Sequence, residues 1–165
     1  MDDNFTLDLP DEAATLQFGA VMAKAMRPNL TLYLHGDLGA GKTTLVRGLL
    51  HALGHVGKVK SPTYTLVESY EIKSKIHFKL NLYHFDLYRF DDEDEWESAG
   101  FRDYFNAESI CIIEWPEKAQ NVLPTPDIDI TFDVKILGKS FGRSITISAH
   151  SILGKQCLQV ISMAI

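Results

Sequence analysis

The sequence predicts an α/β fold, in which helices flank a mixed β-sheet with a C-terminal antiparallel hairpin. Three observations carry the prediction. A short apolar run, residues 30–35, is followed by a glycine-rich loop and then by apolar residues at helical spacing up to Leu53. A continuous apolar run over 109–116 is typical of a central parallel strand. Two alternating segments, 127–136 and 143–149, predict an antiparallel hairpin that is joined near two glycines.

The glycine-rich loop, 36–44, reads Gly-Asp-Leu-Gly-Ala-Gly-Lys-Thr-Thr and matches the phosphate-binding pattern of Gly, four residues, Gly, Lys and Ser or Thr. Its glycines let successive backbone N–H groups point into one concavity. Lys42 supplies a positive charge for the outer phosphates, the Thr43 hydroxyl can ligate Mg²⁺, and the following helix directs its positive end at the same anion. We therefore expect a phosphate-loop NTPase-like fold that binds a nucleoside triphosphate. The expected contacts come from Asp37, Leu38, Gly39, Ala40, Gly41, Lys42, Thr43 and Thr44.

The length and composition suit one compact domain over residues 1–165, with ordinary hydrophobic and charged fractions of 45% and 23%. The net charge of −6 argues against a chain that grips nucleic acid by itself, although a small basic patch could lie within the acidic total. No apolar run is long enough to span a bilayer, and the acidic N-terminus does not resemble a signal peptide. We expect a cytoplasmic protein without a membrane segment. Cys111 and Cys157 have no metal-ligand spacing and are expected to be buried, reduced thiols.

The N-terminal half adds several elements around the loop. A short strand over 5–10 precedes a helix that is capped by Asp11 and runs to about Met26. After the loop helix, residues 55–59 suggest a loop and a short strand. In residues 61–67, Pro62 favours extended geometry at Ser61, and the β-branched and aromatic residues that follow predict a further strand. The hydroxyls of that segment, Thr63 among them, could face the γ-phosphate or Mg²⁺, or its residues could simply be good strand formers.

The middle of the chain predicts a hairpin over 68–81 with a charged tip at 71–75, and then a strand over 82–88. That strand places His84, Asp86 and Tyr88 on one face. A charge in an apolar strand is costly unless it is paired or bound, so Asp86 either forms a salt bridge with Arg89 or a lysine or serves the ligand. We expect His84 to be packed and hydrogen-bonded.

Short elements are expected between the last strands. The acidic run 91–97 suits the first turns of a helix and is either a solvated face or a docking surface for a basic partner. A short helix or turn is expected at 101–105 and a short helix at 116–122. The pattern over 151–165 is weak and predicts no element.

Glu114 stands at the C-terminal end of the apolar run 109–116. Ligands of open α/β sheets bind at the C-terminal ends of the strands, and phosphate-loop proteins place a carboxylate there to hold or orient Mg²⁺. Glu114 is therefore a candidate magnesium ligand, with a surface carboxylate at a strand end as the alternative.

Four segments now stand in order: 36–44, Ser-Pro-Thr-Tyr-Thr-Leu (61–66), His-Phe-Asp-Leu-Tyr-Arg (84–89) and Ile-Glu-Trp-Pro (113–116). Together they closely resemble the TsaE (YjeE) family, the bacterial ATPase component of the machinery that makes N6-threonylcarbamoyladenosine in tRNA. The resemblance spans roughly residues 5–135, and the C-terminal tail carries little signal. The stretch 73–82 is slightly longer than the family pattern, a departure confined to a hairpin tip.

The resemblance implies a weak intrinsic ATPase that uses ATP and Mg²⁺ and acts with TsaB and TsaD, where TsaD performs threonylcarbamoyl transfer to the adenosine at position 37 of tRNAs that read ANN codons. The net charge of −6 indicates that any contact with tRNA passes through a partner. Thr43 and Glu114 would be magnesium ligands, Asp86 would lie by the nucleotide, and the Ser-Pro-Thr segment containing Thr63 would be a switch loop. Lys42, Asp86 and Glu114 are thus the expected catalytic residues.

Lys42 and Mg²⁺ would neutralise charge on the transferring phosphoryl group, and Glu114 or Asp86 would orient the attacking water. No arginine finger is evident within the chain; Arg89 is a candidate, but pairing with the acidic run 91–97 is favoured. Two other functions are possible: a small-molecule kinase, for which the arginines are few and unclustered, and a nucleotide-gated interaction module in which hydrolysis is incidental. The absence of an Asn-Lys-x-Asp segment favours ATP over GTP.

Overall fold

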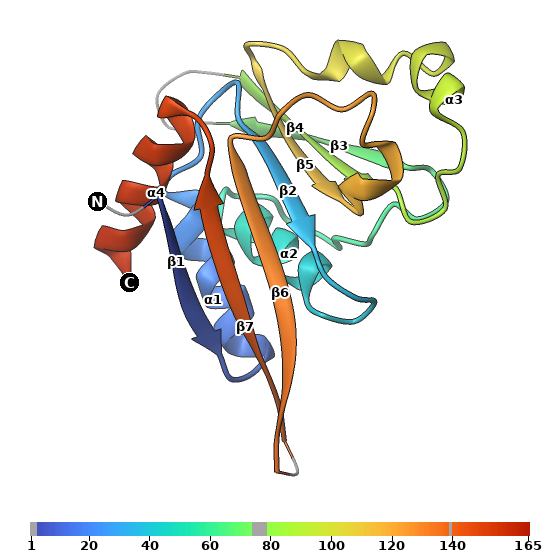
Figure 1. Cartoon of the computed structure of the whole chain (residues 1–165). Coiled ribbons are helices and arrows are strands. Elements are labelled where there is room, and N and C mark those ends of the chain that lie inside the picture. Colours follow the sequence, from blue (N-terminus) through green and yellow to red (C-terminus); the bar gives the residue numbers. More distant parts are fainter. Residues whose placement is uncertain (1–2, 74–78, 139) are drawn as a thin grey trace.

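A computed structural model describes residues 3–73, 79–138 and 140–165 of the chain. Within these residues, seven strands form one sheet in the order β1-β7-β6-β2-β5-β4-β3 (Figure 1). The strands are β1 (Asn4–Leu9), β2 (Thr31–His35), β3 (Val67–Lys73), β4 (Lys79–Asp86), β5 (Ser109–Glu114), β6 (Ile128–Leu137) and β7 (Ser140–Ala149). The helices are α1 (Glu12–Ala23), α2 (Lys42–Ala52), α3 (Glu93–Ser98) and α4 (Ile152–Ala164), with the 3₁₀ turns η1 (Phe101–Tyr104) and η2 (Pro116–Ala119).

The centre of the sheet is parallel. Strand β2 lies between β5 and β6 and runs parallel to both, and β4 runs parallel to β5. The pairs β1–β7, β6–β7 and β3–β4 are antiparallel, so the sheet is mixed. The predicted α/β fold, with flanking helices and the C-terminal hairpin β6–β7, is therefore confirmed.

The strand register gathers the sequence motifs at one edge. Glu114, the last residue of β5, lies opposite Asp86 of β4 on one side and Leu34 of β2 on the other. The glycine-rich loop follows β2 directly and leads into α2. Because the carboxyl ends of parallel strands meet at the same edge of a sheet, three segments that are far apart in sequence meet there.

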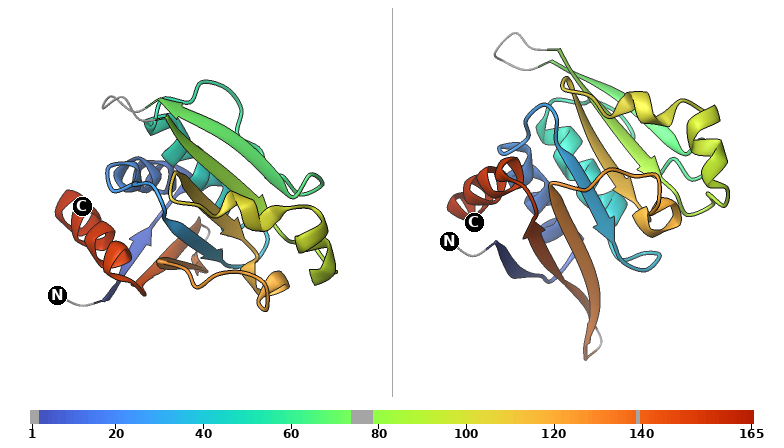
Figure 2. Two further views of the ribbon diagram at one scale, coloured as in Figure 1. Left: turned by 90° about the horizontal axis from the view of Figure 1, so that it is seen from above. Right: turned by 45° about the horizontal axis from the view of Figure 1, so that its top comes forward.

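Helices cover both faces of the sheet. Helices α1 and α2 lie on one face, and α3 and η1 lie on the other (Figure 2). Strand β5 contributes to both hydrophobic clusters: Ile110 and Ile112 pack in the cluster with α1 and α2, whereas Cys111 and Ile113 pack in the cluster around Trp96. This double burial explains the continuous apolar run in the sequence.

Two glycines bring α1 and α2 close together. A Cβ atom at Gly19 would lie 2.5 Å from the carbonyl oxygen of Leu45, and one at Gly48 would lie 2.4 Å from that of Leu16. Both distances are too short for any side chain. Each glycine lowers the helix propensity of its own segment, and the close helix pair that they permit compensates for this loss.

The prediction of a strand over 61–67 is wrong, because only Val67 of this segment lies in a strand. Residues 63–65 form a turn, Leu66 adopts a left-handed conformation with φ 69°, and β3 begins at Val67. The Leu66 amide donates to the carbonyl oxygen of Pro62 at 2.7 Å, which closes the turn. Strand propensity is overridden here because the Ser61 and Thr63 hydroxyls have a hydrogen-bond partner on another strand, described below.

Other boundaries also differ from the predictions. Residues 55–59 form no strand, and the strand predicted over 82–88 ends at Asp86, so Tyr88 lies outside it. Part of the predicted tip 71–75 lies outside the described residues. The C-terminal residues, whose sequence pattern predicted no element, form the helix α4. The Ser151 hydroxyl caps its first turn by accepting a hydrogen bond from the Gly154 amide at 2.9 Å.

The cysteines are buried and unbridged, as expected. Burial raises the pKa of the Cys111 thiol to about 12 and that of the Cys157 thiol to about 11. Among the described helices, none has both the length and the apolar character that crossing a membrane requires.

Candidate functional site

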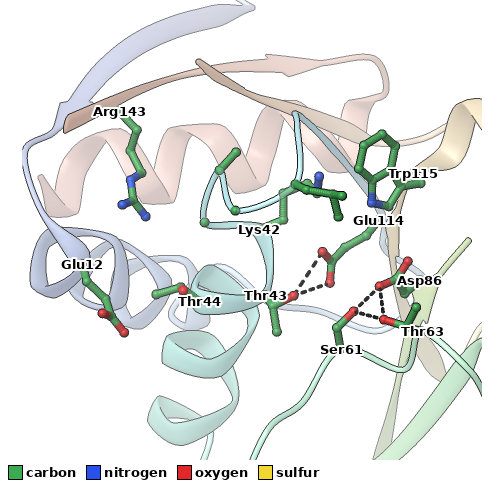
Figure 3. Close-up of a pocket in the computed structure, with 14 residues that line it drawn as sticks. Glu12, Lys42, Thr43, Thr44, Ser61, Thr63, Asp86, Glu114, Trp115 and Arg143 are labelled. Carbon is green, nitrogen blue, oxygen red and sulfur yellow. Dashed lines mark hydrogen bonds between the residues drawn. The ribbon is translucent and has the colours of Figure 1, made fainter. Parts of the chain in front are cut away.

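A pocket of about 360 Å³ lies at the sheet edge where the motifs meet (Figure 3). This volume falls within the usual range for small-molecule sites. The start of α2 forms its floor, with the glycine-rich loop above it. The lining residues are Glu12, Leu38, Gly39, Ala40, Gly41, Lys42, Thr43, Thr44, Ser61, Thr63, Asp86, Glu114, Trp115 and Arg143. The predicted site residues are all among them except Asp37.

The loop holds Lys42 folded back against its own backbone. The Lys42 ammonium donates to the carbonyl oxygens of Gly36 and Asp37, the second at 3.2 Å, and it lies 4.0 Å from the centre of the Trp115 ring. Asp37 therefore contributes a backbone carbonyl rather than pocket lining. Burial lowers the pKa of Lys42, although nearby carboxylates, foremost Glu114, act in the opposite direction. The loop has thus buried a cation whose present partners are mainly neutral.

Thr43 and Glu114 are in direct contact in the pocket, as the dashed lines in Figure 3 show. The Thr43 hydroxyl lies 3.2 and 3.0 Å from the two carboxylate oxygens of Glu114. Oxygen atoms of this kind are the ligands that Mg²⁺ prefers, and the ion usually takes few of them from protein and the rest from phosphates and water. Among the described residues, no three His, Cys, Asp or Glu side chains are placed to hold a metal without such help.

His84 holds the Glu114 carboxylate by a buried hydrogen bond. Its Nε2 donates to Glu114 Oε2 at 2.6 Å, and both side chains are almost fully buried. Sequence reasoning expects a packed, hydrogen-bonded histidine, and this is correct, but it misses the partner. The sequence did contain a signal that His84 belongs near the site. His84 lies two residues before Asp86, so the alternation of a strand places both on the same face of β4.

Asp86 anchors the turn that replaces the predicted strand. Its carboxylate accepts hydrogen bonds from the Ser61 hydroxyl, from the Thr63 hydroxyl at 3.2 Å and from the Tyr88 amide at 3.0 Å. These donors satisfy the buried charge, so the alternative of a salt bridge with Arg89 or a lysine is wrong for the described residues.

Arg89 instead lies over the ring of Tyr64, 4.6 Å from its centre. The predicted pairing of Arg89 with the acidic run 91–97 is not found among the described ion pairs; Glu97 of that run pairs with Arg102. Asp92 caps α3 by accepting from the Asp94 amide, which confirms the helix at this acidic segment.

Trp115 has the left-handed backbone conformation, with φ 60° and ψ 48°. A non-glycine residue adopts this conformation at a cost of about 1 kcal/mol or more. Here it turns the chain between β5 and η2 and leaves the indole ring against the Lys42 ammonium. Trp115 lies in the Ile-Glu-Trp-Pro segment, which sequence reasoning used only for Glu114.

The other end of the pocket contains residues that no motif marks. Glu12 comes from the start of α1 and Arg143 from β7, and Figure 3 shows both on the side away from Asp86, with Thr44 between Glu12 and Thr43. A site assembled from a strand and a helix that lie more than one hundred residues apart carries no local sequence signal. Tertiary structure alone reveals it.

The mixed sheet with a glycine-rich loop between β2 and α2 defines a phosphate-loop NTPase-like α/β protein. The family model described as "Threonylcarbamoyl adenosine biosynthesis protein TsaE" matches residues 9–143. The chain therefore belongs to the TsaE family and takes part in tRNA threonylcarbamoyladenosine biosynthesis, as the resemblance implied.

Individual relatives agree with this assignment. A Haemophilus influenzae protein named tRNA threonylcarbamoyladenosine biosynthesis protein TsaE is 46% identical and aligns over 97% of this chain and 99% of its own length. The protein of the same name from Bacillus subtilis is 37% identical over 73% of this chain and 71% of its own length. The crystal structure of Bacillus subtilis YdiB superposes with a TM-score of 0.74 at 27% identity, covering 99% of this chain and 97% of that one.

Proposed function

We propose that this protein is a Mg²⁺-dependent ATPase that turns over slowly alone and is stimulated by a complex of TsaB and TsaD during the threonylcarbamoyl modification of tRNA. Its membership of the TsaE family supports the pathway. One observation carries the enzymatic part. The phosphate loop, the Thr43–Glu114 pair and Asp86 converge on one pocket at the carboxyl edge of the sheet.

In this proposal the loop binds the phosphates of ATP, and Lys42 leaves the carbonyl oxygens of Gly36 and Asp37 for a phosphate oxygen. That exchange replaces neutral acceptors with an anion, which favours a buried ammonium. Thr43 and Glu114 would hold Mg²⁺, which would supply positive charge for the phosphoryl transfer. The nearby oxygen pair, 3.0 Å apart, fits that role.

Two carboxylates are available to orient a water. His84 occupies one oxygen of Glu114, and Ser61, Thr63 and the Tyr88 amide occupy Asp86. In the proposal Glu114 is committed to the metal, so Asp86 orients the water together with the Ser61 and Thr63 hydroxyls. Among the described pocket residues, Lys42 is the cation nearest the proposed γ-phosphate position, because Arg143 lies at the end away from Asp86. Slow turnover without a partner follows.

The proposal includes a cytoplasmic location, an indirect relation to tRNA through the partners, and ATP and ADP as the nucleotides. The experiment that tests it is ATP turnover by the purified chain, alone and after addition of purified TsaB and TsaD. Turnover should be slow alone and rise at least tenfold with the pair. If turnover does not change when TsaB and TsaD are added, the proposed partner-stimulated function is rejected, whereas the assignment of the phosphate loop still stands.

A second candidate is a nucleotide-gated interaction module in which hydrolysis is incidental. One observation favours it. Tyr64 follows directly after Thr63, which Asp86 holds inside the pocket, yet its own side chain is 82% exposed. A change at the pocket would therefore move a large exposed aromatic ring. A non-hydrolysable ATP analogue should support many rounds of modification if binding suffices, and about one round if hydrolysis is required.

A further inference from the structure

Arg143 lines the pocket and forms no ion pair with the residues that the structure describes. Its Nε is buried and has no acceptor among those residues. A buried donor without an acceptor is costly, and native structures rarely contain one unless a ligand or water completes it. The other charged residues of this pocket all have protein partners: Glu12, Lys42, Asp86 and Glu114.

The guanidinium lies against the phosphate loop itself. A Cβ atom at Gly41 would lie 2.4 Å from Arg143 Nη1, so the glycine is what leaves room for the arginine. Gly41 also has φ 110°, a conformation that side chains rarely adopt, and it directly precedes the first residue of α2. The arginine and the helix N-terminus thus bring positive charge to the same point from two directions.

Strand β7 fixes the backbone of Arg143. Its backbone pairs with Leu9 of β1 on one side and with Val134 of β6 on the other. Side chains on paired central strands are placed more accurately than side chains on loops. The point from which this side chain extends is therefore set by the sheet.

The position of Arg143 in the pocket indicates which part of a bound nucleotide it would contact. Figure 3 shows Arg143 and Glu12 at one end of the pocket and Asp86, Ser61 and Thr63 at the other, with Lys42 and Thr43 between them. The proposed reaction occurs at the end with Asp86, so the phosphates run from there toward Arg143. The Glu12 carboxylate at the Arg143 end repels further phosphate charge and suits the uncharged nucleoside.

We propose that Arg143 binds the phosphate nearest the ribose and so determines the affinity for the nucleotide, not the rate of γ-phosphate cleavage. This inference rests on the proposed nucleotide site. Arginine suits the role because its planar guanidinium donates two parallel hydrogen bonds to phosphate oxygens, which lysine does not do. The phosphate in question is common to ADP and ATP, so both should lose affinity equally when Arg143 is changed.

The test measures dissociation constants for ADP and for a non-hydrolysable ATP analogue by calorimetry on the full chain. Arg143→Met keeps the volume of the side chain and removes its charge. It should raise both dissociation constants by the same factor, about 10- to 100-fold. The kcat at saturating ATP, measured with and without the partners, should change less than threefold. Arg143→Lys should recover part of the affinity.

The matched control is Arg102→Ala, which removes one positive charge from an exposed ion pair away from the pocket and should leave both constants unchanged. A melting curve of each variant establishes that it is folded. The inference is overturned if Arg143→Met binds ADP as tightly as the wild type does, or if it loses affinity for the ATP analogue alone together with kcat. Failure of the wild type to bind either nucleotide would instead overturn the proposed function itself.

Discussion

His84 and Glu114 form a buried pair in which Nε2 of the histidine lies 2.6 Å from a carboxylate oxygen of the glutamate. Both side chains come from parallel strands, β4 and β5, near the edge where the glycine-rich loop lies. The Thr43 hydroxyl lies 3.0 Å from the oxygen that His84 holds and 3.2 Å from the other oxygen of Glu114. The histidine therefore sets the direction in which the glutamate can offer an oxygen to a metal ion.

His84→Leu should lower kcat for ATP hydrolysis by about tenfold and raise the Mg²⁺ concentration needed for half-maximal activity, because groups that orient metal ligands typically contribute that much. His84→Gln keeps an N–H donor and should lose less. Titration of Mg²⁺ at saturating ATP measures both effects. The core variant Ile113→Val serves as a stability control, since it should lower the melting temperature without moving the Mg²⁺ curve.

Lys42→Ala and Glu114→Ala should separate binding from hydrolysis. Lys42→Ala removes the mobile charge of the loop and should abolish tight nucleotide binding. Glu114→Ala should weaken ADP binding much less than it lowers turnover, because the carboxylate acts through the metal. Calorimetry with ADP and a phosphate-release assay measure the two quantities. Wild-type turnover in both variants would contradict the catalytic assignment.

Gly19→Ala should destabilise the protein, although alanine is the better helix former. In an exposed helix this change stabilises by about 1 kcal/mol. Here the added methyl would meet the Leu45 carbonyl oxygen at 2.5 Å, and relieving such overpacking costs about 1–3 kcal/mol. Urea unfolding gives the free energy directly. Gln17→Ala, on the exposed side of the same helix, should change stability by less than about 0.5 kcal/mol, and a stabilised Gly19→Ala would show that the helices are further apart.

Asp129 should contribute stability that depends on pH. Burial acts to raise its pKa, but hydrogen bonds and charge from His35 at 2.6 Å and from His150 at 2.7 Å outweigh burial and hold the pKa below its usual value. A carboxylate with a depressed pKa in the folded state stabilises the protein above its unfolded pKa of about 4, and this contribution disappears as pH falls through the lower folded value.

The Asp129→Asn variant should therefore be less stable than the wild type at pH 6, and the difference should shrink below about pH 4. Melting temperatures from pH 3 to pH 7 test this. Asp133→Asn changes an exposed carboxylate on the same strand that forms no ion pair among the described residues, and it should track the wild type throughout. A constant difference for Asp129→Asn across the range would contradict the predicted linkage.

The core of the fold was predictable because its signals are local. The loop between 36 and 44, the buried run that became β5 and the alternating hairpin each carry a periodicity or composition that their own residues determine. Glu114 was also predictable, since a carboxylate at the end of a central strand must reach the ligand edge of the sheet.

The errors arise where side chains that are distant in sequence decide the local structure. Ser61 and Thr63 have strand-like neighbours, but Asp86 attracts both hydroxyls and the segment turns instead. Arg143 sits in a strand whose alternation predicts its backbone, yet only the β1–β7–β6 arrangement brings it to Gly41. Local propensity contains no information on such tertiary contacts.

The pocket takes one wall from Glu12, near the beginning of the chain, and another from Arg143, on the strand that pairs with β1. A bound ligand therefore ties the first helix to the C-terminal hairpin, and separation of β1 from β7 would release it. Ligand occupancy and the integrity of this side of the sheet become one equilibrium: at a concentration one hundred times its dissociation constant, a ligand adds about 2.7 kcal/mol to the free energy of unfolding. A cell rich in nucleotide would thereby keep the hairpin closed on the protein, whereas depletion would favour local opening and access by proteases.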